Sequence, residues 1–452
     1  MASIAILGAG PTGLGAAYRL RERGVDDFEM FERGGQIGGL ATSFEDPKGY
    51  TWDVSGHIIF SGYPYFNEFL DRMLGKEGVR RIDRESWIKF EDRYVRYPFQ
   101  NHLSSLPEEA MIECLIGLIE SQTIDRERAF RNFEEWVYAK FGAGVAKHFM
   151  VPYNLKVWAT PLSRMGFYWI AERVSVVDWR KALETTLAPQ NVDWGPNATF
   201  GYPATKGTLG LWLAVLPYIG DRVRYRKRAV CIDEEKREIR FSDGSSARYE
   251  KLLTTLPLEA FVARLARAPD EVRAATKKLL FNRLFSLGVG LKRPSPSTKN
   301  WIYFPNPKTP FYRMTYLSNY SPDIVPGGDT SRYCSLLMET TYSRFRPPPS
   351  GDFAKAVIAG LLEEKILAPA DLSTIESVYL IHAGHAYPIP SVERDEALET
   401  IQSYLESKEI YSRGRFGSWK YEIGNQDHSL MQGKEVVDRW LDGSEEKVFL
   451  AK

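Results

Sequence analysis

Three glycines near the N-terminus have the spacing with which a protein backbone binds a diphosphate. Gly8 permits a tight turn after a short apolar run, Gly10 lets the backbone approach a phosphate, and Gly13 lets a helix pack close to a strand. The N-terminus of that helix then faces the phosphates. Glu32 ends a second apolar run about 20 residues later, where a carboxylate can bind a ribose hydroxyl. The pattern predicts a dinucleotide site made by Gly8, Gly10, Pro11, Thr12, Gly13 and Glu32.

A second glycine-rich segment follows at once, with the sequence ERGGQIGGLA at residues 32–41. Two such loops this close suit an extended cofactor whose ribityl chain and pyrophosphate lie along the backbone, so the pattern favours FAD over NAD. Gly38, Gly39 and Leu40 are the residues of this loop that we expect to bind it. The loop resembles that of many flavin amine oxidases, and it therefore indicates a superfamily and not a reaction.

The elements that must position these loops form a strand–helix–strand unit. Ile4–Leu7 and Phe28–Phe31 are short apolar runs, and residues 11–23 between them have helical periodicity. Downstream, residues 85–97 are typical of a hairpin, and residues 107–187 are typical of a mainly helical region. An apolar stripe in that region is interpreted as packed core, and it consists of Ile112, Leu115, Ile116 and Ile119.

Strand patterns return at residues 223–256 and recur through the rest of the chain, with helices between them. Further strands are expected near residues 284–291, 313–317 and 333–339, and helices near 353–364, 392–406 and 429–441. The order predicts an α/β protein, a Rossmann-like FAD-binding domain with a helical insert and a mixed or antiparallel sheet domain. The expected boundaries are 1–100 with 207–260 and 410–452 for the FAD-binding domain, 101–190 for the insert, and 191–206 with 261–409 for the sheet domain.

Composition excludes several classes of protein. The 452 residues carry 59 Lys and Arg against 58 Asp and Glu, so we expect no nucleic-acid partner and no polybasic membrane surface. The three cysteines are far apart, which excludes a disulfide scaffold and a thiolate zinc site and fits a reducing compartment. We expect no metal. The longest uncharged apolar stretch, residues 207–220, is shorter than the roughly 18–20 residues that span a bilayer. Without a signal-peptide pattern before the first strand, we expect a cytoplasmic protein with no membrane span.

Seven further blocks give the chain a close resemblance to the eukaryotic-type UDP-galactopyranose mutases, and the similarity runs in family order from about residue 4 to residue 438. The blocks are SGHIIF at 55–60, YPFQN at 97–101, PYNLKVW at 152–158, WGPNATF at 194–200, PFYR at 310–313, SRGRFGSW at 412–419 and YEIGNQDH at 421–428. The resemblance implies an isomerase that takes a UDP-sugar as its substrate.

The resemblance also implies which residues hold UDP. Arg173 and Arg313 match the arginines of the family that bind the diphosphate, and guanidinium groups suit this because they bind phosphate bidentately. The hydroxyls of Tyr387 and Tyr421 are further donors. The uridine pocket is implied at Phe99, Gln100, Phe149, Tyr153, Asn154 and Trp158, with Tyr97 beside it. An aromatic core of the helical insert is the alternative interpretation of this last group.

The remaining matched positions surround the flavin and the sugar, and they are His57, Phe60, Asn197, Trp301, Tyr303, Arg415, Gly417, Asn425 and Gln426. In the family, reduced FAD attacks the anomeric carbon through N5 and forms a flavin–sugar adduct, so that pyranose and furanose interconvert without net electron transfer. His57 is expected to tune the flavin, which makes it catalytic together with Arg173 and Arg313. NADPH is the implied reductant, and Arg84 and Ser86 match the positions that contact it.

The chain departs from the family pattern at four places. Ser55 replaces a glycine, Gly62 a histidine and Gly201 an arginine, and residues 205–206 replace an Arg-Gly pair. Two alternatives therefore stay open, a related mutase for another nucleotide sugar and a net FAD oxidoreductase of the amine-oxidase superfamily. A non-catalytic UDP-sugar binder is a further alternative. The oligomeric state is also open, because the chain is shorter than the family at one loop and at the C-terminus.

Overall fold

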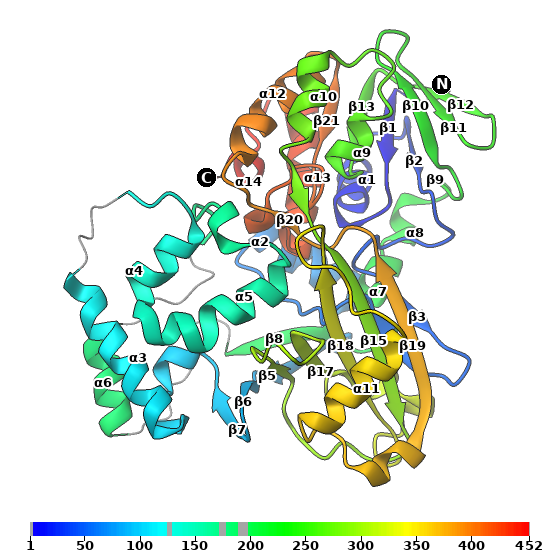
Figure 1. The fold of residues 1–452 in the computed structure, drawn as a ribbon. Coiled ribbons are helices and arrows are strands. Elements are labelled where there is room, and N and C mark those ends of the chain that lie inside the picture. The colour runs from blue at the N-terminus through cyan, green and yellow to red at the C-terminus, as the bar shows by residue number, and fades with distance from the viewer. Residues whose placement is uncertain (1–2, 124–128, 171–177, 189–197, 452) are drawn as a thin grey trace.

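A five-stranded parallel sheet forms the first part of the molecule (Figure 1). The computed structural model describes residues 3–123, 129–170, 178–188 and 198–451. The sheet order is β21-β13-β1-β2-β9, with bounds Ile410–Ser412, Lys251–Thr254, Ile4–Leu7, Phe28–Phe31 and Val223–Arg224. Helix α1 (Pro11–Glu22) connects β1 to β2, so the predicted strand–helix–strand unit is confirmed.

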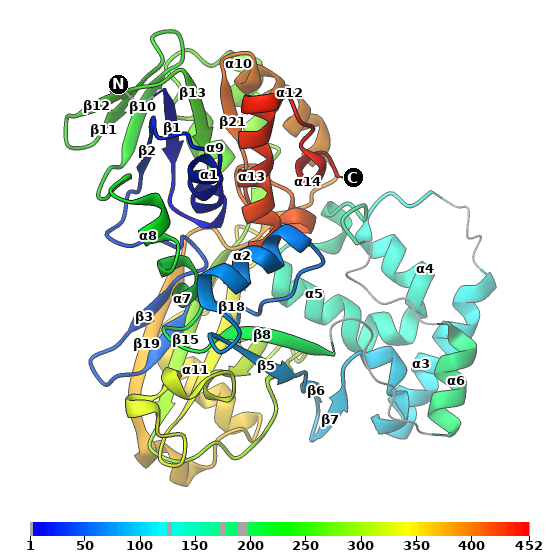
Figure 2. The ribbon, with the colours of Figure 1, turned by 180° about the vertical axis from the view of Figure 1, so that it is seen from behind.

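Helix α13 (Gln426–Asp442) returns from the far end of the chain and packs against α1, as Figure 2 shows. Glycines permit the close approach. A Cβ atom at Gly433 would lie 2.1 Å from the carbonyl oxygen of Thr12, and one at Gly15 would lie 2.8 Å from that of Leu430. Because the two helices are in contact here, the N-terminus of α13 is carried to the same edge of the sheet as the glycine turn.

A seven-stranded mixed sheet forms the second part, as predicted. Its order is β19-β15-β18-β17-β16-β6-β7, with bounds Ile375–Ala383, Arg283–Leu291, Cys334–Tyr342, Arg313–Tyr316, Trp301–Tyr303, Ser86–Phe90 and Arg93–Arg96. All pairs are antiparallel except β16 with β6. Strands β6 and β7 form the hairpin that the sequence predicts. Helix α11 (Phe353–Glu363) contributes Val357 and Leu361 to the apolar core that these strands share.

The helical insert contains α3 (Glu108–Glu120), α4 (Phe133–Val145), α5 (Val151–Trp158) and α6 (Trp179–Leu187). Helices α3 and α4 cross so closely that a Cβ atom at Gly142 would lie 1.9 Å from the carbonyl oxygen of Gly117. This crossing turns the small residues of α3 inward. The prediction that the isoleucine stripe is packed core is therefore wrong, since Ile112, Ile116 and Ile119 are all exposed and Leu115 is only partly buried.

The remaining helices and strands connect and flank these parts. They are β3 (Ser43–Glu45), β4 (Thr51–Asp53), α2 (Pro64–Leu74), β5 (Val79–Asp83), β8 (Thr199–Pro203), α7 (Leu209–Leu213), α8 (Leu216–Ile219), β10 (Ala229–Asp233), β11 (Glu238–Phe241), β12 (Ser246–Arg248), α9 (Leu258–Val262), α10 (Asp270–Thr276), β14 (Leu280–Phe281), β20 (Pro388–Ile389), α12 (Arg394–Glu406) and α14 (Lys447–Leu450). No helix within the described ranges combines the length and the apolar character needed to cross a membrane. The boundaries expected for the three parts of the chain stay a prediction.

Candidate active site

The glycine turn after β1 leaves room where a cofactor would need it. Gly8 has φ +101°, and a Cβ atom there would lie 2.2 Å from Thr255 Oγ1. A Cβ atom at Gly13 would lie 2.1 Å from the carbonyl oxygen of Gly8, so both glycines are required by the packing of the protein itself. At Gly10 the nearest atom to a Cβ would be Gly39 Cα, at 3.8 Å. The protein itself therefore does not require a glycine at position 10, and the room beside this backbone fits a diphosphate.

The start of α1 supports the same fit. Its N-cap is Gly10, which has no side chain to accept from the N–H groups of the first turn, and Pro11 is the first helical residue. The first N–H groups of a helix lack intrahelical acceptors, so an anion is well placed there. The two loops are also joined to each other, because Gly38 N donates to the carbonyl oxygen of Ala9 at 2.8 Å. This donor set fits the pyrophosphate of FAD.

Glu32 holds the glycine loops in place. Its carboxylate accepts from Ala9 N at 3.0 Å and from Gly34 N at 2.7 Å. Each carboxylate oxygen has two lone pairs, so these bonds leave acceptor capacity for a ribose hydroxyl. The residue that the sequence predicts as a ribose ligand thus also stabilises the site.

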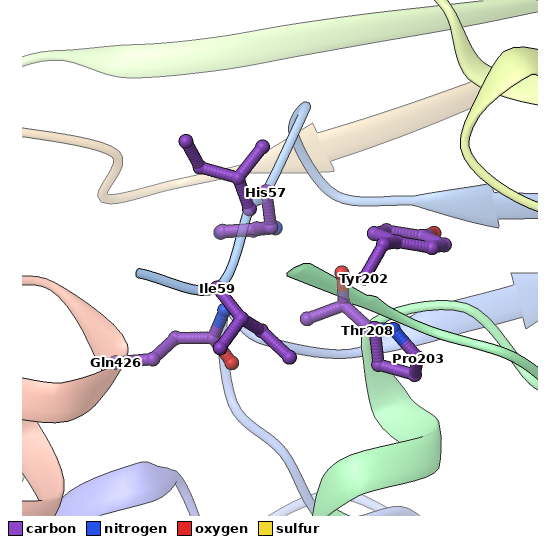
Figure 3. A pocket seen from close by; sticks show the side chains of 7 residues that line it. His57, Ile59, Tyr202, Pro203, Thr208 and Gln426 are labelled. Atoms are coloured by element: carbon purple, nitrogen blue, oxygen red, sulfur yellow. The ribbon is translucent and has the colours of Figure 1, made fainter. Parts of the chain in front are cut away.

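His57 lines a small cavity (Figure 3). Tyr202, Pro203 and Thr208 line the opposite wall, and Gln426 at the start of α13 completes it. The cavity has no room for a water molecule, so it is too small for a ligand the size of a flavin. Burial lowers the pKa of His57, although the carboxylates of Asp53 and Glu339 oppose the shift. Because its pKa is lowered, the imidazole is neutral near pH 7. Within the described residues its Nδ1 atom is buried without a hydrogen-bond partner, so this atom can bond to a ligand.

Arg313 forms a buried ion pair with Glu339, directly opposite on β18. Its Nε and Nη2 both donate to the carboxylate, with Nη2 at 2.9 Å from Oε1. Glu339 is fully buried, and the hydroxyl of Tyr312 donates to it at 3.1 Å. Burial alone would raise the pKa of Glu339, but the guanidinium outweighs this and holds the pKa below its ordinary value. Within the described residues Nη1 makes no hydrogen bond, which leaves this nitrogen for a ligand.

Aromatic rings from the insert form a column next to this pair. The Phe99 and Phe149 ring centroids are 5.0 Å apart at 12°, and those of Phe149 and Tyr153 are 5.1 Å apart at 8°. The edge of the Tyr303 ring from β16 meets Tyr153 at 5.1 Å, and Tyr97 meets Tyr303 at 5.1 Å. Phe99 and Phe149 are buried, so they support the column from inside. Gln100 is also buried.

A second aromatic group comes from α5 and the C-terminal segment. Trp158 meets Tyr421 at 4.8 Å and Tyr387 at 5.8 Å. The Arg415 guanidinium lies 4.9 Å from the Tyr387 ring centre, and its Nε donates to the carbonyl oxygen of Ala386 at 3.0 Å. The Tyr387 and Tyr312 hydroxyls are 3.1 Å apart. Because Tyr312 also donates to Glu339, this contact connects the second aromatic group to the ion pair.

Other expected ligands are engaged locally. Asn154 accepts from Trp158 Nε1 at 3.1 Å and donates to the carbonyl oxygen of Met150 at 2.7 Å. Phe60 is exposed. Asn425 is the N-cap of α13 without a side-chain cap bond, and a Cβ atom at Gly417 would lie 2.2 Å from the carbonyl oxygen of Arg413, so Gly417 is required by its own turn.

Arg84 lies over two rings of the site. Its guanidinium is 5.4 Å from the Tyr97 ring centre and 5.0 Å from that of Trp301, and its Nε donates to Ser86 Oγ at 3.1 Å. The two residues expected at the NADPH position are therefore adjacent to the aromatic column. Trp301 Nε1 is buried without a partner in the part of the chain that the structure describes.

Arg173 and Asn197 lie outside the described residues, so their places in the site stay a prediction. Conversely, sequence reasoning missed Glu339 and Tyr312. A signal for Glu339 exists, because it is a lone carboxylate within the apolar strand CSLLMETTY. A charged residue in such a strand needs a partner of opposite charge.

The chain matches known proteins at two levels. A family model described as an NAD(P)-binding Rossmann-like domain matches residues 6–73. A Baeyer-Villiger monooxygenase of Streptomyces coelicolor is 34% identical over 98 residues, which is 18% of this chain and 19% of that protein. One of Pseudomonas aeruginosa is 32% identical over 87 residues, 19% of this chain and 16% of that protein. The chain thus spans less than a fifth of the length of these relatives.

Comparison of structures extends over the whole molecule. A candidate protoporphyrinogen oxidase from Exiguobacterium sp. 255-15 has a TM-score of 0.70 at 15% identity, covers 97% of this chain and 98% of its own, and shares the fold alone. The crystal structure of a reduced UDP-galactopyranose mutase has a TM-score of 0.95 and is 37% identical, covering 100% of this chain and 98% of that one. Because sequence and fold agree over the full length, this chain belongs to the UDP-galactopyranose mutase family.

Proposed function

We propose that this protein is an isomerase that interconverts UDP-galactopyranose and UDP-galactofuranose and requires reduced FAD. The observation that carries the proposal is the full-length agreement of sequence and fold with a UDP-galactopyranose mutase. The site gives it chemical support, because it combines Arg313, two aromatic groups and a neutral histidine with two glycine loops that suit a dinucleotide.

FAD fits the edge of the parallel sheet. The Gly8–Gly13 turn and the start of α1 would hold its pyrophosphate, and Glu32 a ribose hydroxyl. The other residues that would contact it are Gly38, Gly39, Leu40, Arg415, Gly417, Asn425 and Gln426. When bound in its reduced form, FAD supplies the nucleophile for the anomeric carbon of the sugar.

The chain's own groups bind and orient the UDP. Arg313 offers Nη1 to the diphosphate, while Glu339 fixes the other nitrogens and partly neutralises the charge. A guanidinium that is paired with a carboxylate can still bind phosphate, and its charge is not left unpaired when no ligand is bound. The hydroxyls of Tyr387 and Tyr421 and the guanidinium of Arg173 would complete the diphosphate site.

Aromatic residues of the insert would bind uridine. Tyr153 ends the column that Phe99 and Phe149 support, and a base can stack on such a platform. Gln100, Asn154, Trp158 and Tyr97 are the other residues of this proposed pocket, while Phe60, Asn197, Trp301 and Tyr303 are proposed to face the sugar.

His57 is proposed to act on the flavin through a hydrogen bond. Its neutral imidazole has an unpartnered Nδ1 atom within the described residues, and the neutral ring can donate or accept there. Arg84 and Ser86 are proposed to bind NADPH as the reductant. The cytoplasm is the location we infer, since Cys114, Cys231 and Cys334 are all free thiols.

A substrate panel tests the proposal. Enzyme reduced with dithionite under nitrogen is mixed with UDP-galactofuranose, UDP-galactopyranose, UDP-glucose or UDP-arabinose, and the products are separated by chromatography. The proposal predicts interconversion of the two galactose forms without oxygen or net reductant consumption. Faster conversion of another sugar would identify a related mutase instead, and turnover in air without a change of ring form would identify an oxidase.

A further inference from the structure

The Ser55 hydroxyl lies between the two members of the buried ion pair. It accepts a hydrogen bond from Arg313 Nη2 at 3.1 Å and donates one to Glu339 Oε1 at 2.5 Å. Arg313 Nη2 also donates to that same carboxylate oxygen at 2.9 Å. The Ser55 hydroxyl, Arg313 Nη2 and Glu339 Oε1 are therefore joined in a closed ring of three hydrogen bonds.

This ring limits how the guanidinium can turn. Nε and Nη2 of Arg313 both donate to Glu339. Ser55 Oγ accepts from Nη2 from a second direction at 3.1 Å, and the carbonyl oxygen of Gly56 accepts there more weakly at 3.5 Å. A planar guanidinium held at these two nitrogens has a fixed direction for its third, Nη1. Nη1 is the nitrogen that makes no hydrogen bond within the described residues. Ser55 thus helps to set where Arg313 presents its remaining N–H groups.

The backbone that carries Ser55 is itself anchored. Ser286 Oγ donates to the carbonyl oxygen of Val54 at 2.5 Å, and His57 N donates to that of Ser55 at 2.8 Å. The backbone is therefore fixed on both sides of Ser55. Ser55 is also the position where the chain has a serine in place of the glycine expected from the family resemblance.

We propose that Ser55 is a positioning residue for the diphosphate of the UDP-sugar and that it acts through Arg313. The inference rests on the proposed function and assigns the serine to UDP affinity, not to the choice of sugar. Its hydroxyl faces the ion pair, and both of its hydrogen bonds are made there.

The test compares Ser55→Ala with the wild type. Glu339 keeps Arg313 and Tyr312 as donors in the variant, so folding and FAD content should not change. We expect Kd for UDP, measured by calorimetry on the oxidised FAD-bound protein, and KM for the UDP-sugar to rise by about tenfold, because a guanidinium that Ser55 no longer holds must be ordered when UDP binds. The kcat value and the ratio of kcat/KM between UDP-sugars should stay within about twofold.

Two further variants separate positioning from loosening of the segment. Ser286→Ala removes a buried hydroxyl bound to the same backbone but leaves Arg313 untouched, so UDP affinity should stay at the wild-type value. In an Arg313→Lys background, which lacks Nη2, Ser55→Ala should have no additional effect on UDP affinity.

The outcomes are distinct. If the wild type binds UDP and Ser55→Ala binds it equally well, the inference is wrong while the proposed function stands. An equal loss in Ser286→Ala, an undiminished effect of Ser55→Ala in the Arg313→Lys background, or a changed sugar preference would also overturn it. A wild-type protein that does not bind UDP would overturn both.

Discussion

Removal of Arg313 should destabilise the protein as well as weaken UDP binding. In Arg313→Ala the fully buried Glu339 loses both of its charged donors and keeps only the hydroxyls of Ser55 and Tyr312. Breaking a buried ion pair from one side costs about 3–5 kcal/mol. Because two hydroxyl donors remain and the Arg313 side chain is 19% exposed, we expect the lower end, about 3 kcal/mol.

Urea unfolding of the FAD-bound protein, followed by tryptophan fluorescence, measures this loss as a lower midpoint at an unchanged slope. The matched control is Glu339→Gln combined with Arg313→Ala. An amide leaves no buried charge, so the double variant should recover most of the stability but none of the UDP binding. The Glu339→Gln variant alone should still bind UDP, because Arg313 is present in it and keeps its full charge.

The pH dependence gives a second readout. Arg313 holds the pKa of Glu339 below its ordinary value of 4.5, so the pair contributes stability above that pH and loses it as the pH falls through the lower, folded value. In Arg313→Ala the buried carboxyl instead favours its protonated form. The stability gap between wild type and variant should therefore begin to narrow above pH 4.5, where the variant's carboxyl takes up a proton, and narrow further as the pH falls through the lower folded pKa of Glu339 in the wild type. Equal midpoints for Arg313→Ala and the double variant at pH 7 would refute the reasoning.

Three other predictions follow from the site. Gly10→Ala should fold normally but lose FAD, since a Cβ atom there meets no protein atom closer than 3.8 Å. Gly384→Ala, where a Cβ atom meets nothing within 4 Å, should keep FAD, and the flavin absorbance of the purified protein measures both. Arg84→Ala should slow flavin reduction by NADPH in stopped-flow experiments and leave reduction by dithionite unchanged; equal NADPH rates would remove Arg84 from that site. Burial lowers the pKa of His57, so the unfolded chain binds more protons and stability should fall as the pH drops below about 6.5. Urea midpoints of His57→Asn should show less of this decline, and an identical decline would exclude His57 as its source.

Local patterns were sufficient for the elements near the cofactor loops. The strands Ile4–Leu7 and Phe28–Phe31 have the predicted bounds, and helix α1 ends one residue before the predicted limit. Each is specified by short-range periodicity and by the glycines and proline at its ends. The hairpin of β6 and β7 is specified in the same way.

Contacts between distant segments were not predictable from such patterns. The isoleucines of α3 have helical spacing, but the inward face of the helix is chosen by the close crossing at Gly117 and Gly142, which no local rule reveals. The pairing of Arg313 with Glu339 depends on the register of β17 and β18. The contact of Ser55 with both residues spans more than 250 positions, and only the assembled sheets bring them together.

The requirement for reduced FAD is the central claim and has a direct test. The same preparation is given UDP-galactofuranose under nitrogen, once oxidised and once after dithionite reduction, while product and flavin absorbance are recorded together. We predict that the oxidised enzyme binds the nucleotide sugar without converting it. The reduced enzyme should form UDP-galactopyranose over many turnovers with the flavin still reduced at the end. Turnover by the fully oxidised enzyme, or flavin oxidation in proportion to product, would contradict the account.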